Sequence, residues 1–113
     1  MKQCVIKAVQ DKEIKVLFIT PERLFMEDLS KFGRPISMVC VDEIHCSSEW
    51  SHNFRPAYLV LHEMIREKLG DQTRVIGLTA TATRAAQQQI CDIFDIKYPN
   101  HIVTQTDLSR LNL

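Results

Sequence analysis

The sequence predicts an α/β fold with a parallel sheet and helices on both faces, because short apolar runs alternate with helix-like segments along the chain. Residues 16–19, 38–41 and 75–78 are short apolar runs, which is the pattern of strands buried on both faces. A further short strand is expected near residues 101–103. Since helix-like segments separate these runs, consecutive strands are expected to run in the same direction.

The expected helices begin at capping residues or prolines and end at glycines. Thr20 can cap a helix that starts at Pro21, and Gly33 can end it. An apolar stripe at i, i+4 and i+7 favours one continuous helix between these points, through Phe25, Leu29 and Phe32. By the same criteria the helices span residues 3–10, 21–32, 56–69 and a last segment that Thr83 can cap.

The composition excludes several classes of protein. Lys+Arg and Asp+Glu both total 14, so the chain is not a bulk polyanion binder, and any contact with nucleic acid must use a few local basic side chains. The four cysteines form no C-x-x-C pair, which argues against a structural zinc site and a disulfide framework. Without a long apolar span or a signal peptide, a cytosolic or nuclear setting is expected.

Polar clusters follow the apolar runs directly, at residues 20–22, 42–45 and 79–81. In parallel sheets, ligands bind beyond the carboxyl ends of the strands, and these ends share one rim. The sequence therefore predicts a functional site on that rim.

Asp42 and Glu43 are the candidate catalytic pair of this rim. One carboxylate can hold a hydrated Mg²⁺ while the other orients or deprotonates the water that attacks a nucleotide. The alternative is an Asp-Glu pair that merely ends a strand in a solvated turn.

Several segments together resemble the RecQ-type DNA helicases. Residues 42–45 (Asp-Glu-Ile-His) match the DExH box of superfamily 2 helicases, and residues 77–83 are similar to the RecQ motif III. Residues 46–56 resemble the aromatic-rich loop of RecQ enzymes, residues 17–24 the motif Ib region, and residues 108–113 the segment that leads into a second motor domain. The amino-acid sequence of residues 50–56 most resembles that of the RecQ-like type 4 helicases.

The resemblance implies a partial RecA-like (P-loop NTPase) helicase domain. Residues 1–106 would be the C-terminal part of the first RecA-like domain, and residues 107–113 the start of the connection to the second RecA-like domain of the parent chain. It further implies ATP and Mg²⁺ as cofactors, 3′→5′ unwinding of DNA at single-stranded and duplex junctions, and work in DNA repair, recombination or replication in the nucleus.

The resemblance also implies a role for each site residue. Asp42 would bind Mg²⁺ through water, Glu43 would be the general base, and His45 would link the nucleotide site to the aromatic-rich loop. The residues expected to contact DNA or couple it to hydrolysis are Thr20, Arg23, Trp50, His52, Phe54, Arg55, Thr79 and Thr81.

Plainer roles stay open for several of these residues. Trp50 and Phe54 could anchor the loop onto the sheet, although we expect Phe54 to be partly packed and Trp50 to face DNA. His52 could be a hydrogen-bonding loop residue, and Thr79 and Thr81 could simply end a strand. Arg55 can reach a phosphate or a carboxylate across the loop.

The loop departs from the RecQ pattern at Glu49, Ser51 and Asn53. Glu49 places an anion near the expected DNA path, which should weaken DNA contact unless Arg55 or another cation pairs with it. Ser51 lacks the freedom of glycine at positive φ.

A phosphate-binding G-x-x-x-x-G-K-[ST] loop does not occur among these 113 residues. The fragment alone is therefore expected to be inactive, with residues 75–78 left as an open apolar sheet edge. A DNA-binding or scaffold protein derived from a helicase is the alternative of a different class, and an RNA helicase is a second alternative.

Two apparent zinc motifs are weak. His62-Glu63 begins an H-E-x-x-H motif, but Arg66 occupies the second histidine position, so an exposed helix face is expected there. The spacing of His45, Cys46 and His52 matches no common structural zinc site.

Overall fold

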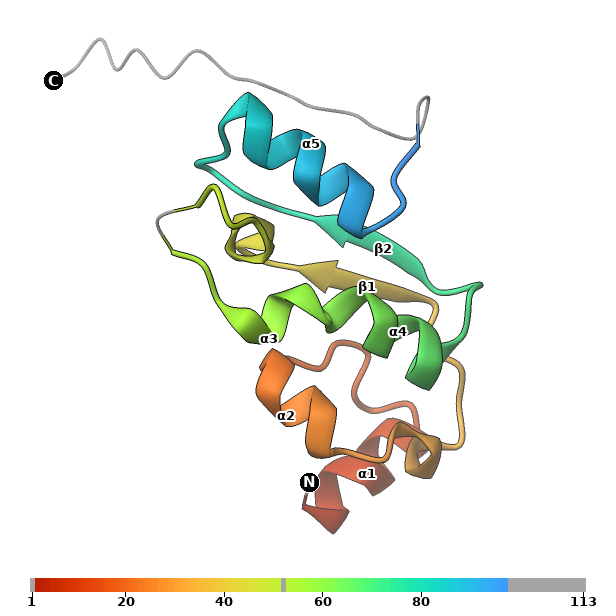
Figure 1. Ribbon diagram of the computed structural model, residues 1–113. Coiled ribbons are helices and arrows are strands. Elements are labelled where there is room, and N and C mark those ends of the chain that lie inside the picture. The colour runs from red at the N-terminus through yellow and green to blue at the C-terminus, as the bar shows by residue number, and fades with distance from the viewer. Residues whose placement is uncertain (1, 52, 98–113) are drawn as a thin grey trace, which may run out of the picture.

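The computed structural model describes residues 2–51 and 53–97 of the chain (Figure 1). Its elements follow in the order α1 (Gln3–Gln10), α2 (Pro21–Met26), η1 (Leu29–Phe32), β1 (Met38–Val41), η2 (Ile44–Ser47), α3 (Pro56–Leu59), α4 (Leu61–Leu69), β2 (Arg74–Gly77) and α5 (Arg84–Ile93), where η marks a 3₁₀-helix. The strand expected near residues 101–103 and the connection at residues 107–113 lie outside the described residues. None of the described helices is long and apolar enough to span a membrane.

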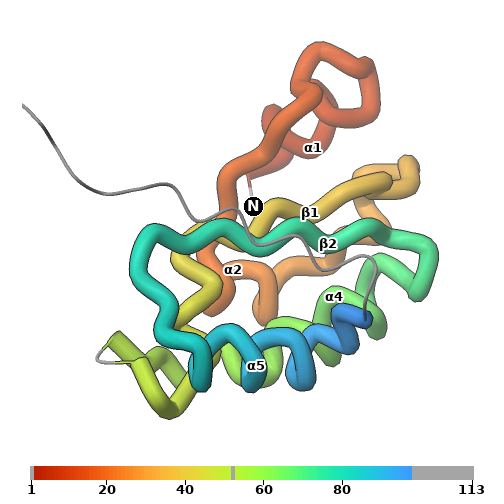
Figure 2. Tube along the Cα trace, turned by 90° about the horizontal axis from the view of Figure 1, so that it is seen from above, coloured from red at the N-terminus to blue at the C-terminus, as the bar shows by residue number. Residues whose placement is uncertain are grey.

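The parallel α/β architecture is confirmed. Strands β1 and β2 pair in parallel, with Val39 opposite Val75 and Val41 opposite Gly77. Figure 2 shows α2, α4 and α5 on one side of the strands and α1 on the other side. Thr83 caps α5 as predicted, because its hydroxyl accepts a hydrogen bond from the Ala86 amide at 3.2 Å.

The core lies between the strands and the helices of this one side. Val39, Val41 and Val75 face it, whereas Met38 and Ile76 on the opposite face are 54% and 46% exposed. Burial of both strand faces, predicted from the apolar runs, is therefore wrong for the described residues. The open edge of β2 is as expected, since β1 is its one partner among the described strands.

The strand predicted at residues 16–19 is not formed, so this second prediction is wrong. Val16 and Phe18 are 70% and 94% exposed, while Leu17 and Ile19 pack against the core. The alternation suits a strand, but a strand also needs a hydrogen-bonding neighbour, and none pairs with this segment in the described part of the chain.

The helix predicted over residues 21–32 is split into α2 and η1. Its ends are as expected: the Thr20 hydroxyl accepts from the Arg23 amide, and Gly33 adopts the left-handed conformation at φ 61°. Between them, Asp28 starts a new turn by accepting from the Ser30 amide at 3.1 Å. The Lys68 ammonium stabilises the break by donating to the carbonyls of Phe25 and Glu27 at 2.8 and 2.7 Å.

Replacement of Lys68 by Met tests this bridge between α4 and the α2–η1 break. The apolar stem would stay, but two carbonyls would lose a charged donor, so we expect a loss of about 1–2 kcal/mol in the free energy of unfolding. Denaturant unfolding of the chain measures it. Glu67→Gln on the exposed face of α4 is the control, and equal stability of the two variants would contradict the bridging role.

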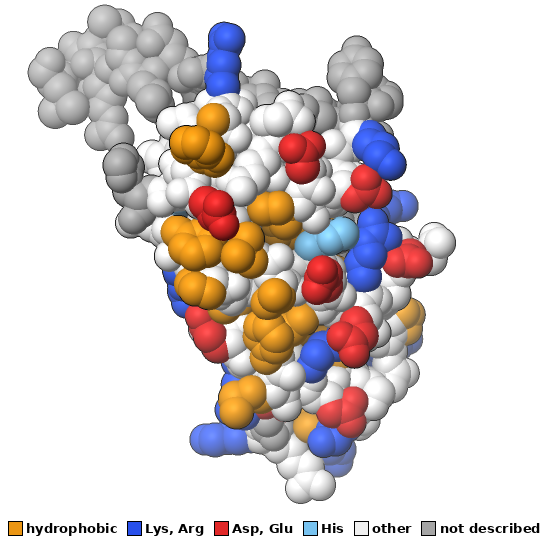
Figure 3. Space-filling model, in the orientation of Figure 1, with side chains coloured by type: hydrophobic (Ala, Val, Ile, Leu, Met, Phe, Trp, Pro, Cys, Tyr) orange, Lys and Arg blue, Asp and Glu red, His pale blue; other side chains and the backbone are white. Residues whose placement is uncertain are grey.

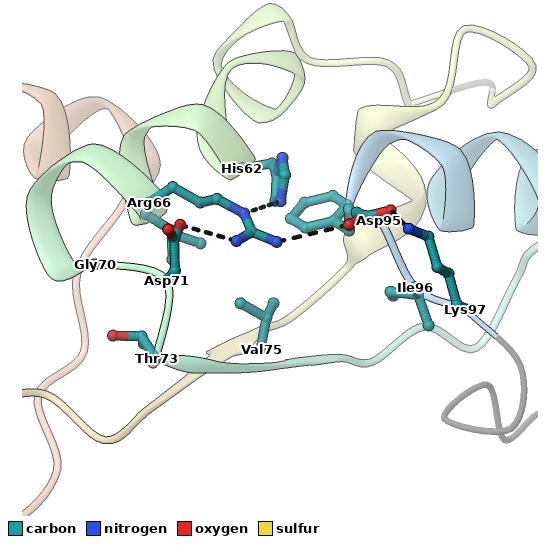
Figure 4. A pocket seen from close by; sticks show the side chains of 11 residues that line it. His62, Arg66, Gly70, Asp71, Thr73, Val75, Asp95, Ile96 and Lys97 are labelled. Carbon is teal, nitrogen blue, oxygen red and sulfur yellow. Dashed lines mark hydrogen bonds and ion pairs between the residues drawn. The ribbon is translucent and has the colours of Figure 1, made fainter.

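A pocket of about 190 Å³ lies beside the amino end of β2, away from the strand ends that carry Asp42 and Thr79 (Figure 4). Arg66 of α4 is at its centre and pairs with Asp71 at 2.9 Å and with Asp95 at 3.9 Å. Side chains of both charges also gather along one edge of the face seen in Figure 3. The pocket is therefore a charged junction between α4 and the end of α5.

His62 belongs to this junction, so the expectation that it lies on an exposed helix face is wrong. Its ring is half-buried, packs edge-on against Phe94 with ring centroids 5.6 Å apart, and accepts a hydrogen bond from Arg66 Nε at 3.0 Å. Burial, followed by the charge of Arg66, lowers the pKa of His62 below its ordinary value.

Acid should therefore destabilise the chain through His62. The folded state favours the neutral ring, so this contribution is present above the ordinary histidine pKa of about 6.5 and is lost as the pH falls through the lowered pKa. We expect unfolding free energy to fall less between about pH 7 and pH 5 in His62→Gln than in the wild type. Parallel pH profiles for the two proteins would disprove the assignment.

Candidate functional site

The carboxyl ends of β1 and β2 meet, as the sequence predicts. The Leu78 amide donates to the Val41 carbonyl at 2.9 Å, and the Ile44 amide donates back to the Leu78 carbonyl at 2.9 Å. Ile44 is buried against Gly77, where an added Cβ would lie 2.4 Å from Ile44 Cδ1. The absence of a side chain at Gly77 thus lets the turn after β1 lie directly on β2.

Asp42 and Glu43 lie exposed at this junction. The Asp42 carboxylate accepts a hydrogen bond from the Glu43 amide at 3.0 Å, and the Asp42 carbonyl accepts one from the Tyr58 hydroxyl at 3.3 Å. Glu43 adopts a left-handed conformation at φ 51°, which is uncommon for a residue with a side chain. Such backbone conformations cluster at functional sites, where the surroundings hold a side chain in a required direction.

His45 joins the two strand ends beneath this pair. It is 4% exposed, and its Nδ1 lies 2.8 Å from Thr79 Oγ1 and 3.1 Å from Glu43 Oε2. Thr79 Oγ1 also accepts a hydrogen bond from the Thr81 amide at 3.3 Å. Four of the predicted site residues, Glu43, His45, Thr79 and Thr81, therefore form one continuous network.

The network has two alternative proton arrangements. A neutral imidazole carries one proton, so Nδ1 either donates it or accepts one from a hydroxyl. If Nδ1 is protonated, it can donate to the Glu43 carboxylate; if it is not, it can accept from the Thr79 hydroxyl. Glu43 and Thr79 are thus alternative hydrogen-bond partners of the same His45 nitrogen.

The aromatic-rich loop, residues 46–56, begins within η2. Its two ends are closed by the Arg55 amide, which donates to the Cys46 carbonyl at 2.9 Å. Trp50 is 70% exposed and Phe54 is 37% exposed. These exposures agree with the expectation that Phe54 is partly packed and Trp50 open to solvent, whereas their contact with DNA stays a prediction. His52 lies outside the described residues.

Arg55 is engaged by a carboxylate of another element. Its guanidinium binds Glu22 of α2 at 2.5 Å and lies over the Tyr58 ring, 5.3 Å from the centroid. A backbone hydrogen bond and then Arg55 lower the pKa of the Glu22 carboxyl. Arg55 therefore joins the loop to the segment that contains Thr20, and it pairs with Glu22 rather than with Glu49.

Thr20 and Arg23 have structural partners. The Thr20 hydroxyl accepts from the Arg23 amide at 3.2 Å, and the Arg23 guanidinium pairs with Glu27 one turn further along at 2.5 Å. The Arg23 side chain is still 54% exposed. Its contact with DNA stays a prediction.

Among the described residues, metal ligands of the zinc type do not gather at this site. Within residues 2–51 and 53–97, no group of three or more His, Cys, Asp or Glu side chains is placed to hold a metal ion. Burial raises the pKa of the Cys46 thiol beside His45, which favours the protonated thiol over the thiolate that binds metals.

Sequence reasoning missed two contributors to this site. Tyr58 lies in the helix predicted over residues 56–69 and is not among the predicted site residues, yet a buried tyrosine needs a hydrogen-bond partner, and its hydroxyl donates to the Asp42 carbonyl. Gln89 of α5 accepts hydrogen bonds from the loop. No local pattern distinguishes it from the neighbouring glutamines.

Comparison with known proteins gives the family. Residues 2–90 match the model of the DEAD/DEAH box helicase family. The chain is 38% identical over 97 residues to the ATP-dependent DNA helicase Q4 of Mus musculus, covering 79% of this chain and 8% of that protein.

Similar proteins also occur in Arabidopsis thaliana and Bacillus subtilis. The ATP-dependent DNA helicase Q-like 5 of Arabidopsis thaliana is 42% identical, with 86% of this chain and 11% of the relative covered. The ATP-dependent DNA helicase RecQ of Bacillus subtilis (strain 168) is 36% identical, with 96% of this chain and 18% of the relative covered. The chain thus spans less than a fifth of the length of these relatives.

The family match covers both strands, the DExH turn and the aromatic-rich loop. The resemblance to RecQ enzymes, including those of type 4, is confirmed by the relatives. This chain belongs to the DEAD/DEAH box helicase family, and its relatives within it are RecQ-type DNA helicases.

Proposed function

We propose that this chain is part of the first RecA-like domain of an ATP-dependent 3′→5′ DNA helicase. Residues 1–106 would belong to that domain, and residues 107–113 would begin the connection to a second RecA-like domain. The parent would unwind DNA at single-stranded and duplex junctions in the nucleus, in repair, recombination or replication. The observation that carries the proposal is the network from Glu43 through His45 to Thr79, next to an exposed tryptophan.

The exposed carboxylates suit a hydrated Mg²⁺. Mg²⁺ prefers oxygen ligands and keeps several of its waters, so a carboxylate at an open strand end can hold it through water. Asp42 would be that residue, since its carboxylate is held in place by the Glu43 amide at 3.0 Å. When bound, the metal would neutralise charge on the phosphates of ATP.

Glu43 would take the proton of the attacking water. Its side chain is 57% exposed, which leaves room for water and nucleotide, and the backbone at φ 51° fixes its direction. His45 beneath it would sense its charge and protonation. Because the same His45 nitrogen can also bond to Thr79, hydrolysis would be reported to the segment after β2 and to the adjoining loop.

DNA would be contacted by a few side chains, in keeping with a net charge of zero. Trp50 presents a flat exposed face on which a base can stack. Because Arg55 is paired with Glu22, it would act mainly by holding the loop. Glu49 lies next to Trp50 and would limit the affinity for the DNA backbone.

The carboxylates should separate by assay in the full-length parent protein. Glu43→Gln keeps size and hydrogen bonding but cannot accept a proton, so we expect Mg·ATP and DNA binding to persist while turnover falls by about 10²–10⁴. Asp42→Ala should weaken hydrolysis and its Mg²⁺ dependence together. Steady-state hydrolysis and nucleotide binding measure both, with the exposed Glu63→Gln of α4 as the control.

A Glu43→Gln protein that kept more than about a tenth of wild-type turnover would contradict the catalytic role. DNA binding without any ATP hydrolysis in the wild-type parent would favour a non-enzymatic scaffold. Preference for RNA duplexes in the unwinding assay would favour an RNA helicase.

Trp50→Ala tests the DNA contact in the same protein. It removes one stacking face, worth about 1–3 kcal/mol per base, so DNA affinity and DNA-stimulated hydrolysis should fall about 5- to 160-fold. The affinity for ATP without DNA should change little, because Trp50 lies on the loop and not among the carboxylates. Met26→Ala, at an exposed apolar side chain outside both the loop and the motif Ib segment, is the control. An equal fall in ATP affinity would make Trp50 a packing residue.

A further inference from the structure

Helix α5 is connected to two parts of the candidate site, the Thr79–Thr81 segment and the aromatic-rich loop. It begins directly after Thr79–Thr81, with Thr83 as its cap. Further along, Gln89 reaches the start of the aromatic-rich loop, where its Oε1 accepts a hydrogen bond from Ser48 Oγ at 2.6 Å and one from the Glu49 amide at 3.1 Å.

The contact continues to Trp50. Ser48 is fully buried at 0% exposure, and its Oγ also accepts a hydrogen bond from the Trp50 amide at 3.2 Å. Gln89 therefore fixes the rotamer of Ser48, and Ser48 fixes the backbone that carries the indole. The exposed Trp50 ring is thus attached to backbone that is held by the buried Ser48, and Ser48 is itself held by Gln89 of α5.

Both bonds use the same acceptor atom of Gln89. The hydroxyl and the amide of the loop are donors, and both end on Oε1. An acceptor at this position is what the loop requires, whereas the amide nitrogen of Gln89 makes neither bond.

We infer that Gln89 is a positioning residue that holds Trp50 in place for DNA and links it to the Thr79–Thr81 segment through α5. This rests on the proposed function for its DNA part. A helix moves largely as one body, so a shift at Thr79–Thr81 is carried to Gln89 and from there to the loop. This route runs beside the direct one through His45 and η2.

Three variants separate this role from mere packing. Gln89→Met keeps the length and volume but removes the acceptor. Gln89→Glu, combined with Glu49→Gln to keep the local charge constant, keeps the acceptor but removes the amide donor. Gln88→Met is the matched control, because Gln88 is exposed and bonds to Asp92 within α5.

The first measurement is time-resolved fluorescence anisotropy of Trp50, the single tryptophan of this chain. We expect the amplitude of the fast component to rise about twofold in Gln89→Met and to stay at the wild-type value in the Glu pair and in Gln88→Met. Unchanged anisotropy in Gln89→Met would overturn the anchoring.

The second measurement is made in the full-length parent. DNA-stimulated hydrolysis should fall about three- to tenfold in Gln89→Met, the effect expected for lost hydrogen bonds, while basal hydrolysis and its KM for ATP stay unchanged. Because Glu49 itself limits DNA affinity, the Glu pair is compared with Glu49→Gln alone, and its stimulation should lie within about twofold of that single variant. Basal hydrolysis that falls equally, or a Glu pair as impaired as Gln89→Met, would overturn the inference.

The two failures are distinguishable. If the wild-type parent shows no DNA-stimulated hydrolysis, the proposed function fails, and the anisotropy of Trp50 still decides whether Gln89 anchors the loop. If stimulation is normal in Gln89→Met despite a mobile Trp50, the coupling role of Gln89 is wrong and the proposed function stands.

Discussion

The parallel pairing of β1 and β2 is the constraint on which the rest of the site depends. The bonds from Leu78 to Val41 and from Ile44 to Leu78 bring the carboxylate turn and the threonine segment together, although more than thirty residues separate them in the chain. A shift of one residue in this register would turn the side chains of one strand to the other face. Gly77 adds to the constraint, since the buried Ile44 occupies the space that a side chain at that position would need.

The described helices cover one face of the two-stranded sheet and leave the other face largely exposed. Helices α4 and α5 cover the inner face, where Ile65 and Phe94 belong to the core. Met38, Ile76 and the nearby edge of β2 are left exposed. The side that is covered is also the side that supports the aromatic-rich loop, so the loop is anchored to buried residues while the Trp50 ring itself is exposed.

Three different kinds of interaction hold the described residues of the loop in place. A backbone hydrogen bond from Arg55 to Cys46 closes its ends, the Arg55–Glu22 ion pair joins it to α2, and Gln89 joins it to α5. The ion pair is largely exposed and is screened by salt, whereas the bonds of Gln89 reach the fully buried Ser48. We therefore expect the α5 connection to be the more persistent of the two side-chain connections.

Local signals determined much of this protein from the sequence by itself. The caps at Thr20 and Thr83, the left-handed Gly33, strand β1 and the meeting of the carboxyl ends of β1 and β2 were all predictable, because each depends on a few neighbouring residues or on the shared direction of parallel strands. The motif order was enough for the family. Residues 16–19 show the limit, since their alternation suits a strand that only a hydrogen-bonding neighbour can complete.

Only the tertiary structure decided the remaining contacts. His62 faces Phe94, Arg55 pairs with Glu22, and Gln89 accepts from Ser48, over separations of 32, 33 and 41 residues. Nothing in the local pattern marks these partners, because a half-buried polar side chain on a helix surface finds its partner through the packing of other elements. Helix propensity and apolar periodicity specify which face of a helix turns inward, whereas hydrogen bonds between distant segments depend on where the neighbouring elements come to lie.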